Sequence, residues 1–212
     1  MSVSSEPASA PGRSRAATRE RLLAAAIDLL ADGGLHGVTS HDIARRAGVA
    51  SGTFYLYFRD KAEIHREILF SALFELRSRS GQALRGADGP RAAAEARARA
   101  LVEFATEHRA VVRILFRKDI QAGDAESDVL SDIATNMTAR LRNDQAKGWF
   151  TLDLEPEIAA QAIVGMTTRL IDWWTEDPSR ASAEQVISTL VHIQQSGTFA
   201  VKHSTDDAAT HN

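Results

Sequence analysis

Residues 39–61 read Thr-Ser-His-Asp-Ile-Ala-Arg-Arg-Ala-Gly-Val-Ala-Ser-Gly-Thr-Phe-Tyr-Leu-Tyr-Phe-Arg-Asp-Lys, and this stretch decides the fold. The pattern predicts two short helices separated by one glycine. Thr39 is suited to cap the first helix, because Asp42 follows three residues later in a capping-box-like pair. Gly48 stands where a left-handed residue would end that helix, and a second helix is expected to open near Ser51.

The two faces of the second helix differ in character. Phe54 and Phe58 are four residues apart and share one face, which we assign to the core of a small domain. The residues left outside are small or carry hydroxyl groups: Ser51, Gly52, Thr53, Tyr55 and Tyr57. Two short helices joined by a glycine-containing turn match the helix-turn-helix, whose second helix enters the DNA major groove. On spacing alone, a structural helical hairpin in an ordinary all-helical protein is an equal alternative.

The segment from about Thr18 to Ile64 resembles the N-terminal domain of TetR-type transcriptional regulators. The matching parts occur in order and at the family's spacing: Arg21–Leu30, Asp32-Gly33-Gly34, Val38-Thr39, Asp42-Ile43-Ala44, Ala47-Gly48-Val49, Gly52-Thr53-Phe54-Tyr55, Tyr57-Phe58 and Asp60-Lys61. The resemblance implies a dimeric DNA-binding regulator, usually a repressor that a small molecule releases from its operator.

The resemblance also implies which residues contact double-stranded DNA. They are Thr39, Ser40, Ser51, Gly52, Thr53, Tyr55, Tyr57 and Lys61. Thr39 and Lys61 would bond phosphates, Gly52 and Thr53 would face base edges, and the two tyrosines would bond the DNA backbone. Ser51 and Leu56 stand where the family often has lysine and histidine, so the operator sequence is not predicted. Missing contacts could come from Arg13, Arg15, Arg19, Arg45 and Arg46, although exposed arginines are more often just solvated.

Composition and charge limit the other possibilities. A chain of 212 residues that is 44% hydrophobic can bury a substantial core in one or two domains. Without cysteine, it has no disulfides or thiolate metal sites. No apolar run approaches the roughly 20 residues that span a bilayer, and no signal-peptide core is present, so we expect a cytoplasmic protein without membrane contact. Residues 1–79 carry 11 Lys and Arg against 9 Asp and Glu, whereas residues 80–212 carry 14 against 19, which favours DNA binding at the N-terminal end only weakly.

Helical periodicity runs through almost the whole chain and predicts an all-α fold of about nine helices without a sheet. We expect a disordered arm at 1–15, a helix-turn-helix domain at 16–62, a helical ligand-binding and dimerisation domain at 63–202 and a disordered tail at 203–212. Asp60 should cap the long helix that leaves the first domain. The later helices are expected near 91–108, 111–116, 127–149, 156–174 and 182–201.

Aromatic and polar residues of the second half are candidates for an effector pocket. The candidates are Phe104, His108, Phe116, Met137, Trp149, Met166, Arg169 and Trp173. The alternative is that most of them only pack, and that Arg169 pairs with a nearby acid. Sites between helices are mostly apolar, which favours a small hydrophobic effector whose charge stays open.

The last two long helices are separated by Asp177-Pro178, and the family resemblance places a four-helix homodimer interface there. Gly165 would allow close approach of helices, and Trp173 or Trp174 could anchor the contact. An intramolecular hairpin is the alternative.

The preferred reading is a ligand-responsive repressor on a palindromic operator, with no enzymatic activity, metal or cofactor. The alternatives are an activator of the same fold and a helical small-molecule carrier or enzyme that does not bind DNA.

Overall fold

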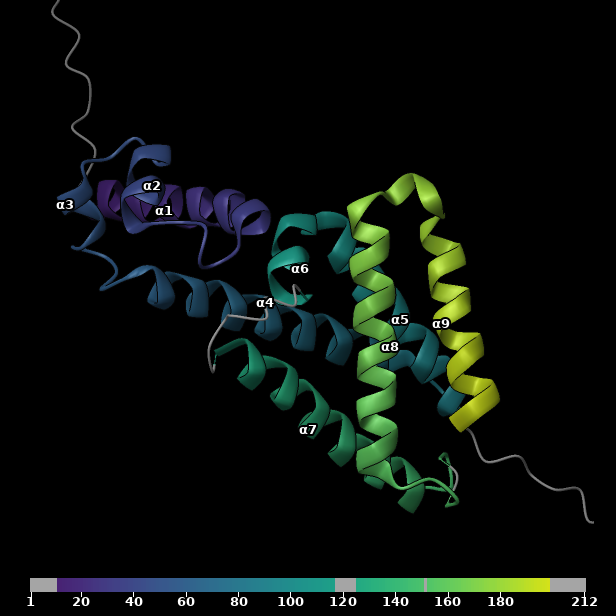
Figure 1. Ribbon diagram of the computed structural model, residues 1–212. Coiled ribbons are helices and arrows are strands. Elements are labelled where there is room, and N and C mark those ends of the chain that lie inside the picture. Colours follow the sequence, from purple (N-terminus) through teal and green to yellow (C-terminus); the bar gives the residue numbers. More distant parts are fainter. Residues whose placement is uncertain (1–10, 117–124, 151, 199–212) are drawn as a thin grey trace, which may run out of the picture. The chain divides into compact units, whose positions relative to one another are not determined.

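The computed structural model describes residues 11–116, 125–150 and 152–198, and within these ranges every regular element is helical (Figure 1). The predicted all-α fold is therefore confirmed. Among the described residues there are nine α-helices: α1 (Pro11–Gly33), α2 (Ser40–Arg46), α3 (Ser51–Phe54), α4 (Lys61–Ala83), α5 (Gly89–Glu107), α6 (Arg109–Phe116), α7 (Ala125–Ala146), α8 (Pro156–Glu176) and α9 (Ala183–Thr198). Two short 3₁₀ helices, η1 (Leu84–Gly86) and η2 (Pro178–Arg180), follow α4 and α8. None of the described helices is long and apolar enough to cross a membrane.

The chain packs as two units, and α4 is divided between them after Phe74. The functional boundary at residue 62 stays a prediction. The first unit contains α1 to α3, the first part of α4, and α6; the second contains the rest of α4, α5, α8, α9 and nearly all of α7. The first turns of α4 belong to the first unit because Ile64 and Ile68 are buried there. An ion pair between Arg19 and Glu67, at 2.5 Å, also ties α4 to α1.

In the first unit, α1 packs against both α2 and α6. Its buried stripe of Leu22, Ala26 and Leu30 follows helical spacing. Helix α1 begins at Pro11, so residues 11–15 of the predicted disordered arm are helical. Residues 1–10 of that arm lie outside the described residues.

In the second unit, α5 packs most extensively against α9 and also contacts α8. Pro156 occupies the first turn of α8, as predicted, and the Glu155 carboxylate accepts hydrogen bonds from the backbone N–H groups of Glu157 and Ile158. The Asp177-Pro178 break is present as η2. The predicted tail at 203–212 lies outside the described residues.

Candidate functional site

The start of α2 is held by a complete capping box. The Thr39 hydroxyl oxygen accepts the Asp42 backbone N–H at 3.1 Å, and an Asp42 carboxylate oxygen accepts the Thr39 backbone N–H at 3.2 Å. The Thr39 hydroxyl also donates to that carboxylate at 2.6 Å. These bonds, chiefly the one from the Thr39 side chain, lower the pKa of Asp42. The predicted cap is confirmed.

Gly48 ends this segment with a φ of +68°, the left-handed conformation that its position predicted. Helix α3 then opens at Ser51 but is only four residues long. After Phe54 the chain continues in tight turns, because the Leu56 N–H bonds the Thr53 carbonyl at 3.2 Å and the Tyr57 N–H bonds the Phe54 carbonyl at 3.0 Å. Residues 51–58 therefore form a single helical turn followed by tight turns.

The two sides of this segment are strongly different. Phe54 and Phe58 are buried and their ring centroids lie 5.8 Å apart, as the spacing predicted. Tyr55 packs edge-on against Phe54, yet 60% of the residue is exposed. Gly52 is exposed, and a Cβ placed on it would meet no atom of the protein within 4 Å. The core thus holds α3 rigidly while its small outer face stays open.

The polar residues around α3 already have partners within the unit. The Ser51 hydroxyl lies 2.7 Å from Nδ1 of His41. The Arg15 guanidinium lies over the Tyr57 ring, 5.8 Å from its centroid. The Lys61 ammonium donates to the carbonyl oxygens of Leu35 at 2.7 Å and Val38 at 2.9 Å. Because an ammonium has three donors, one remains for a further acceptor.

Ser40 and Thr53 complete the predicted set, and both are half-buried. Seven of the eight predicted residues therefore lie on α2, on α3 or in the chain next to these two helices, and Lys61 is the first residue of α4. That they contact DNA stays a prediction.

The predicted effector residues divide between the two units. His108 and Phe116 pack in the first unit, whereas Phe104, Met137, Trp149, Met166, Arg169 and Trp173 belong to the second. Phe104 is buried beneath the Arg79 guanidinium. Met166 is half-buried on α8. Met137 packs against a cluster that contains Leu141, Phe150, Ala159, Ala160 and Ile163.

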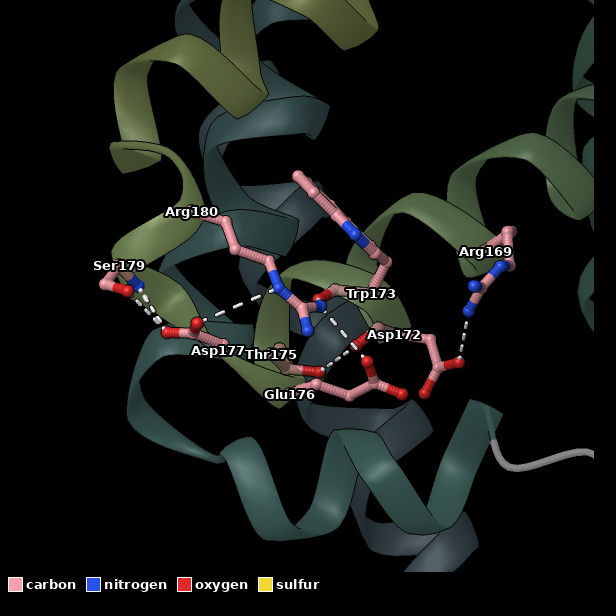
Figure 2. A network of polar contacts seen from close by, with 8 residues as sticks. All are labelled: Arg169, Asp172, Trp173, Thr175, Glu176, Asp177, Ser179 and Arg180. Carbon is pink, nitrogen blue, oxygen red and sulfur yellow. Dashed lines mark hydrogen bonds and ion pairs between the residues drawn. The ribbon is translucent and has the colours of Figure 1, made fainter.

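Arg169 and Trp173 are both exposed on α8 and belong to a network of polar contacts (Figure 2). The Arg169 guanidinium pairs with Asp172 at 3.1 Å, which is the alternative that the sequence left open. Trp173 is 36% exposed, and the Arg180 guanidinium lies over its ring at 5.3 Å. Figure 2 shows Arg180 turned back toward the acids at the end of α8, where it pairs with Glu176 at 3.1 Å.

A charged cavity in the second unit was not predicted. Its volume is about 20 Å³, and its walls come from α5, α7, the segment after α7, and α8. Three charged residues line it: Arg97, Arg140 and Asp144. The remaining lining residues are Pro90, Ala93, Ala94, Leu141, Trp149, Phe150 and Ile163. The sequence does contain a signal for this cavity, namely arginines at positions where helical spacing predicts buried residues. Arg97 lies one helical turn after the buried Ala93, and Arg140 lies one turn after Met137.

Comparison with known proteins shows that most of the chain is similar to regulators of transcription. Residues 22–68 match the family described as bacterial regulatory proteins, tetR family. The HTH-type transcriptional repressor KstR2 of Mycolicibacterium smegmatis is 30% identical over 184 residues, which cover 81% of this chain and 85% of that protein.

Solved structures share the fold. The ketosteroid transcriptional regulator KstR2 of Mycobacterium tuberculosis superposes with a TM-score of 0.68 at 25% identity, over 86% of this chain and 95% of that one. The transcriptional regulator FadR from Bacillus subtilis, in complex with stearoyl-CoA, gives a TM-score of 0.70 at 16% identity, over 84% of this chain and 98% of that one.

Proposed function

Because the chain belongs to the TetR family of bacterial regulatory proteins, it is a ligand-responsive, DNA-binding transcriptional regulator, and we propose that it acts as a homodimeric repressor. In this proposal, α3 of each protomer enters the major groove of one operator half-site. A small hydrophobic molecule bound in the second unit then favours an arrangement that no longer fits the operator.

The observation that carries the DNA assignment is the contrast between the two sides of α3. Phe54 is fully buried, whereas Gly52 and Tyr55 are exposed. Because Gly52 has no side chain, the backbone of α3 can approach base edges closely. The hydroxyl groups of Thr53 and Tyr55 can form hydrogen bonds with bases or phosphates.

Two residues have a double role in the proposal. Thr39 caps α2. In the proposal, a phosphate binds at the exposed start of α2, where backbone N–H groups favour an anion. Lys61 bridges two carbonyls of the α1–α2 connection, and its remaining donor would bind a second phosphate. The ammonium is then held in place before DNA arrives, which reduces the entropy lost on binding.

An exposed stripe on α8 supports the homodimer. Exposed residues recur at intervals of three or four along the helix: Ile158, Ala162, Gly165, Arg169, Trp173 and Glu176. Ile158 and Trp173 are large and apolar, and Gly165 has open space above it. Burying such a stripe against a second copy is favourable, and two linked reading helices would recognise a palindrome with half-sites one helical turn apart.

The assignment as a repressor is supported by KstR2 of M. smegmatis, which is named as a repressor and matches over 81% of this chain, whereas the activator FasR of the same organism matches over 48% of it. That the relatives are regulators argues against the alternative of a helical enzyme. The stearoyl-CoA bound to FadR, a protein of the same fold, supports an effector of apolar character here. Coupling between such a ligand and DNA is typically worth about 1–3 kcal/mol.

Operator selection followed by a salt titration tests the proposal. Duplexes bound by the wild-type protein are selected from a random pool and sequenced, and their dissociation constants are measured by fluorescence anisotropy at several salt concentrations. We expect a palindromic consensus and an affinity that falls steeply with salt, by about 0.9 in log–log slope for each phosphate bound by Lys or Arg. Failure to bind any duplex at low salt would refute the assignment.

A further inference from the structure

The cavity between α5, α7 and α8 has an unbalanced charge. Two guanidinium groups, of Arg97 and Arg140, face one carboxylate, that of Asp144. The Arg140 guanidinium lies 3.6 Å from the Asp144 carboxylate and also contacts the sulfur of Met137. Within the described ranges, the Arg97 side chain makes neither a hydrogen bond nor an ion pair. The lining of the cavity therefore carries one more positive than negative charge, and the single Asp144 carboxylate acts on both guanidinium groups.

The imbalance is costly because the surroundings are apolar. The pKa of Arg140 is lowered to about 10, chiefly by burial and next by the nearby charge of Arg97, while the Asp144 carboxylate opposes the shift to a smaller extent. Burial also lowers the pKa of Arg97. Both groups still carry their charge at neutral pH, so the folded protein keeps two partly desolvated cations around one anion. A structure that needed only a stable core would place apolar side chains here.

Asp144 is engaged on its own side of the cavity. Its residue is 9% exposed, and its backbone carbonyl accepts the N–H groups of Trp149 at 2.8 Å and Phe150 at 3.2 Å. These bonds fix the turn after α7, in which Gly148 has a φ of +68°. Trp149 is half-buried, and the Lys147 ammonium lies 5.0 Å from its ring centroid. The backbone of Asp144 thus anchors the aromatic wall, and its carboxylate forms an ion pair with Arg140 and also attracts Arg97. The five N–H donors of Arg97 make no hydrogen bond within the described ranges and are available to another acceptor.

We propose that Arg97 and Arg140 bind the carboxylate of the effector, which is an apolar monocarboxylic acid whose body packs against Trp149 and Phe150. One carboxylate matches the single excess charge, and its two oxygens suit the paired N–H donors of a guanidinium. A phosphate monoester, with a charge near −2, would leave an excess anion against apolar walls. A volume of about 20 Å³ holds little more than one water molecule, so both the head group and the body of the ligand have to displace side chains of the wall. This proposal rests on the proposed function, in which a small molecule controls operator binding.

Matched acids and amides test the assignment. Butanoate, hexanoate and octanoate are titrated into the full-length protein by calorimetry, each beside the amide of the same chain length. We expect at least one of these acids to bind and to raise the Tm, and its amide to bind at least tenfold more weakly. Equal binding of acid and amide, or no binding of any of the three acids, would overturn the proposal.

Three variants show whether the two arginines are responsible. Arg97→Met and Arg140→Met should each weaken acid binding at least tenfold, whereas Arg142→Gln, at an exposed position on the same helix as Arg140, should leave it unchanged. Without ligand, Arg97→Met should unfold at the wild-type Tm or above it, because the excess charge is gone. A lower Tm together with unchanged acid binding would mean that Arg97 is structural only.

Operator binding by the same preparations distinguishes failure of the carboxylate assignment from failure of the proposed function. If wild-type protein binds its selected operator but none of the acids, only the carboxylate assignment fails. If it binds no duplex, the proposed function fails.

Discussion

A single hydroxyl, that of Thr39, closes the capping box that starts α2. Thr39→Ala removes the acceptor for the Asp42 backbone N–H, and loss of such a cap costs about 1 kcal/mol. We expect the free energy of unfolding, measured in urea, to fall by that order. Thr135→Ala, at an exposed position within α7, is the control and should leave stability nearly unchanged. Equal stability of both variants would show that the cap does not stabilise α2.

Asp42 makes the same cap sensitive to acid. Its pKa in the folded protein is lowered, so the unfolded chain takes up a proton first as the pH falls. The stabilising contribution is therefore complete above the ordinary value of 3.8 and is lost at lower pH. Asp42→Asn should flatten the acid limb of a plot of stability against pH, and an unchanged acid limb would contradict this role.

His65 is the buried titratable residue of α4, with 1% of its surface exposed. Burial, and to a smaller extent the charge of Arg66, lowers its pKa from the ordinary value of 6.5. The unfolded state then binds the proton more tightly than the folded state. The free energy of unfolding is therefore unaffected by protonation of His65 above pH 6.5 and falls as the pH drops toward the lowered pKa.

Unfolding of His65→Gln and His192→Gln at pH 7 and pH 5 tests this role. The wild type and His192→Gln, a change on the exposed side of α9, should both lose stability between the two pH values. His65→Gln should lose clearly less. The same loss in all three proteins would rule out His65 as the cause.

At the scale of the element, the exposed stripe of α8 predicts where the protein dimerises. A side chain added at Gly165 meets no atom of the protein within 4 Å, so Gly165→Gln should leave the fold of the protomer intact. At a close helix–helix contact the same side chain should weaken the dimer at least tenfold, as measured by sedimentation equilibrium. Gly81→Gln, in equally open space on α4, is the matched control. A dimer unaffected by Gly165→Gln would place the interface elsewhere.

Helix starts with a local cap could be predicted from the sequence, and starts without one could not. Thr39 and Asp60 cap through their own side chains, and the Asp60 carboxylate accepts the Glu63 N–H at 2.8 Å. The start of α1 has no comparable local signal among its Ser, Ala and Arg residues. Its first turns lie instead against the folded unit, where Arg15 and Arg19 stack over Tyr57 and Phe58. Those contacts come from residues about 40 positions away, which periodicity cannot reveal.

At the scale of the whole molecule, the sequence indicated the family but did not show that distant segments pack into one unit. The chain returns to the first unit at α6, which packs on α1, and Arg113 pairs with Asp32 at 3.1 Å. A break in composition near Gly81 to Pro90 marks a turn but does not show such a return. The Arg97–Arg140 cavity was missed for a related reason, since a charge on an alanine-rich helix is usually exposed.

The central claim is that the outer face of α3 reads the operator, and Gly52→Ala tests it most directly. The added methyl group has open space in the protein and favours the helix, so the fold should be as stable as the wild type or slightly more stable. Against a base edge the same methyl group should weaken binding to the selected operator at least tenfold. Gly81→Ala, also in open space but on α4, should bind as the wild type does. Unchanged operator affinity of Gly52→Ala, in a protein that folds and dimerises normally, would contradict the account.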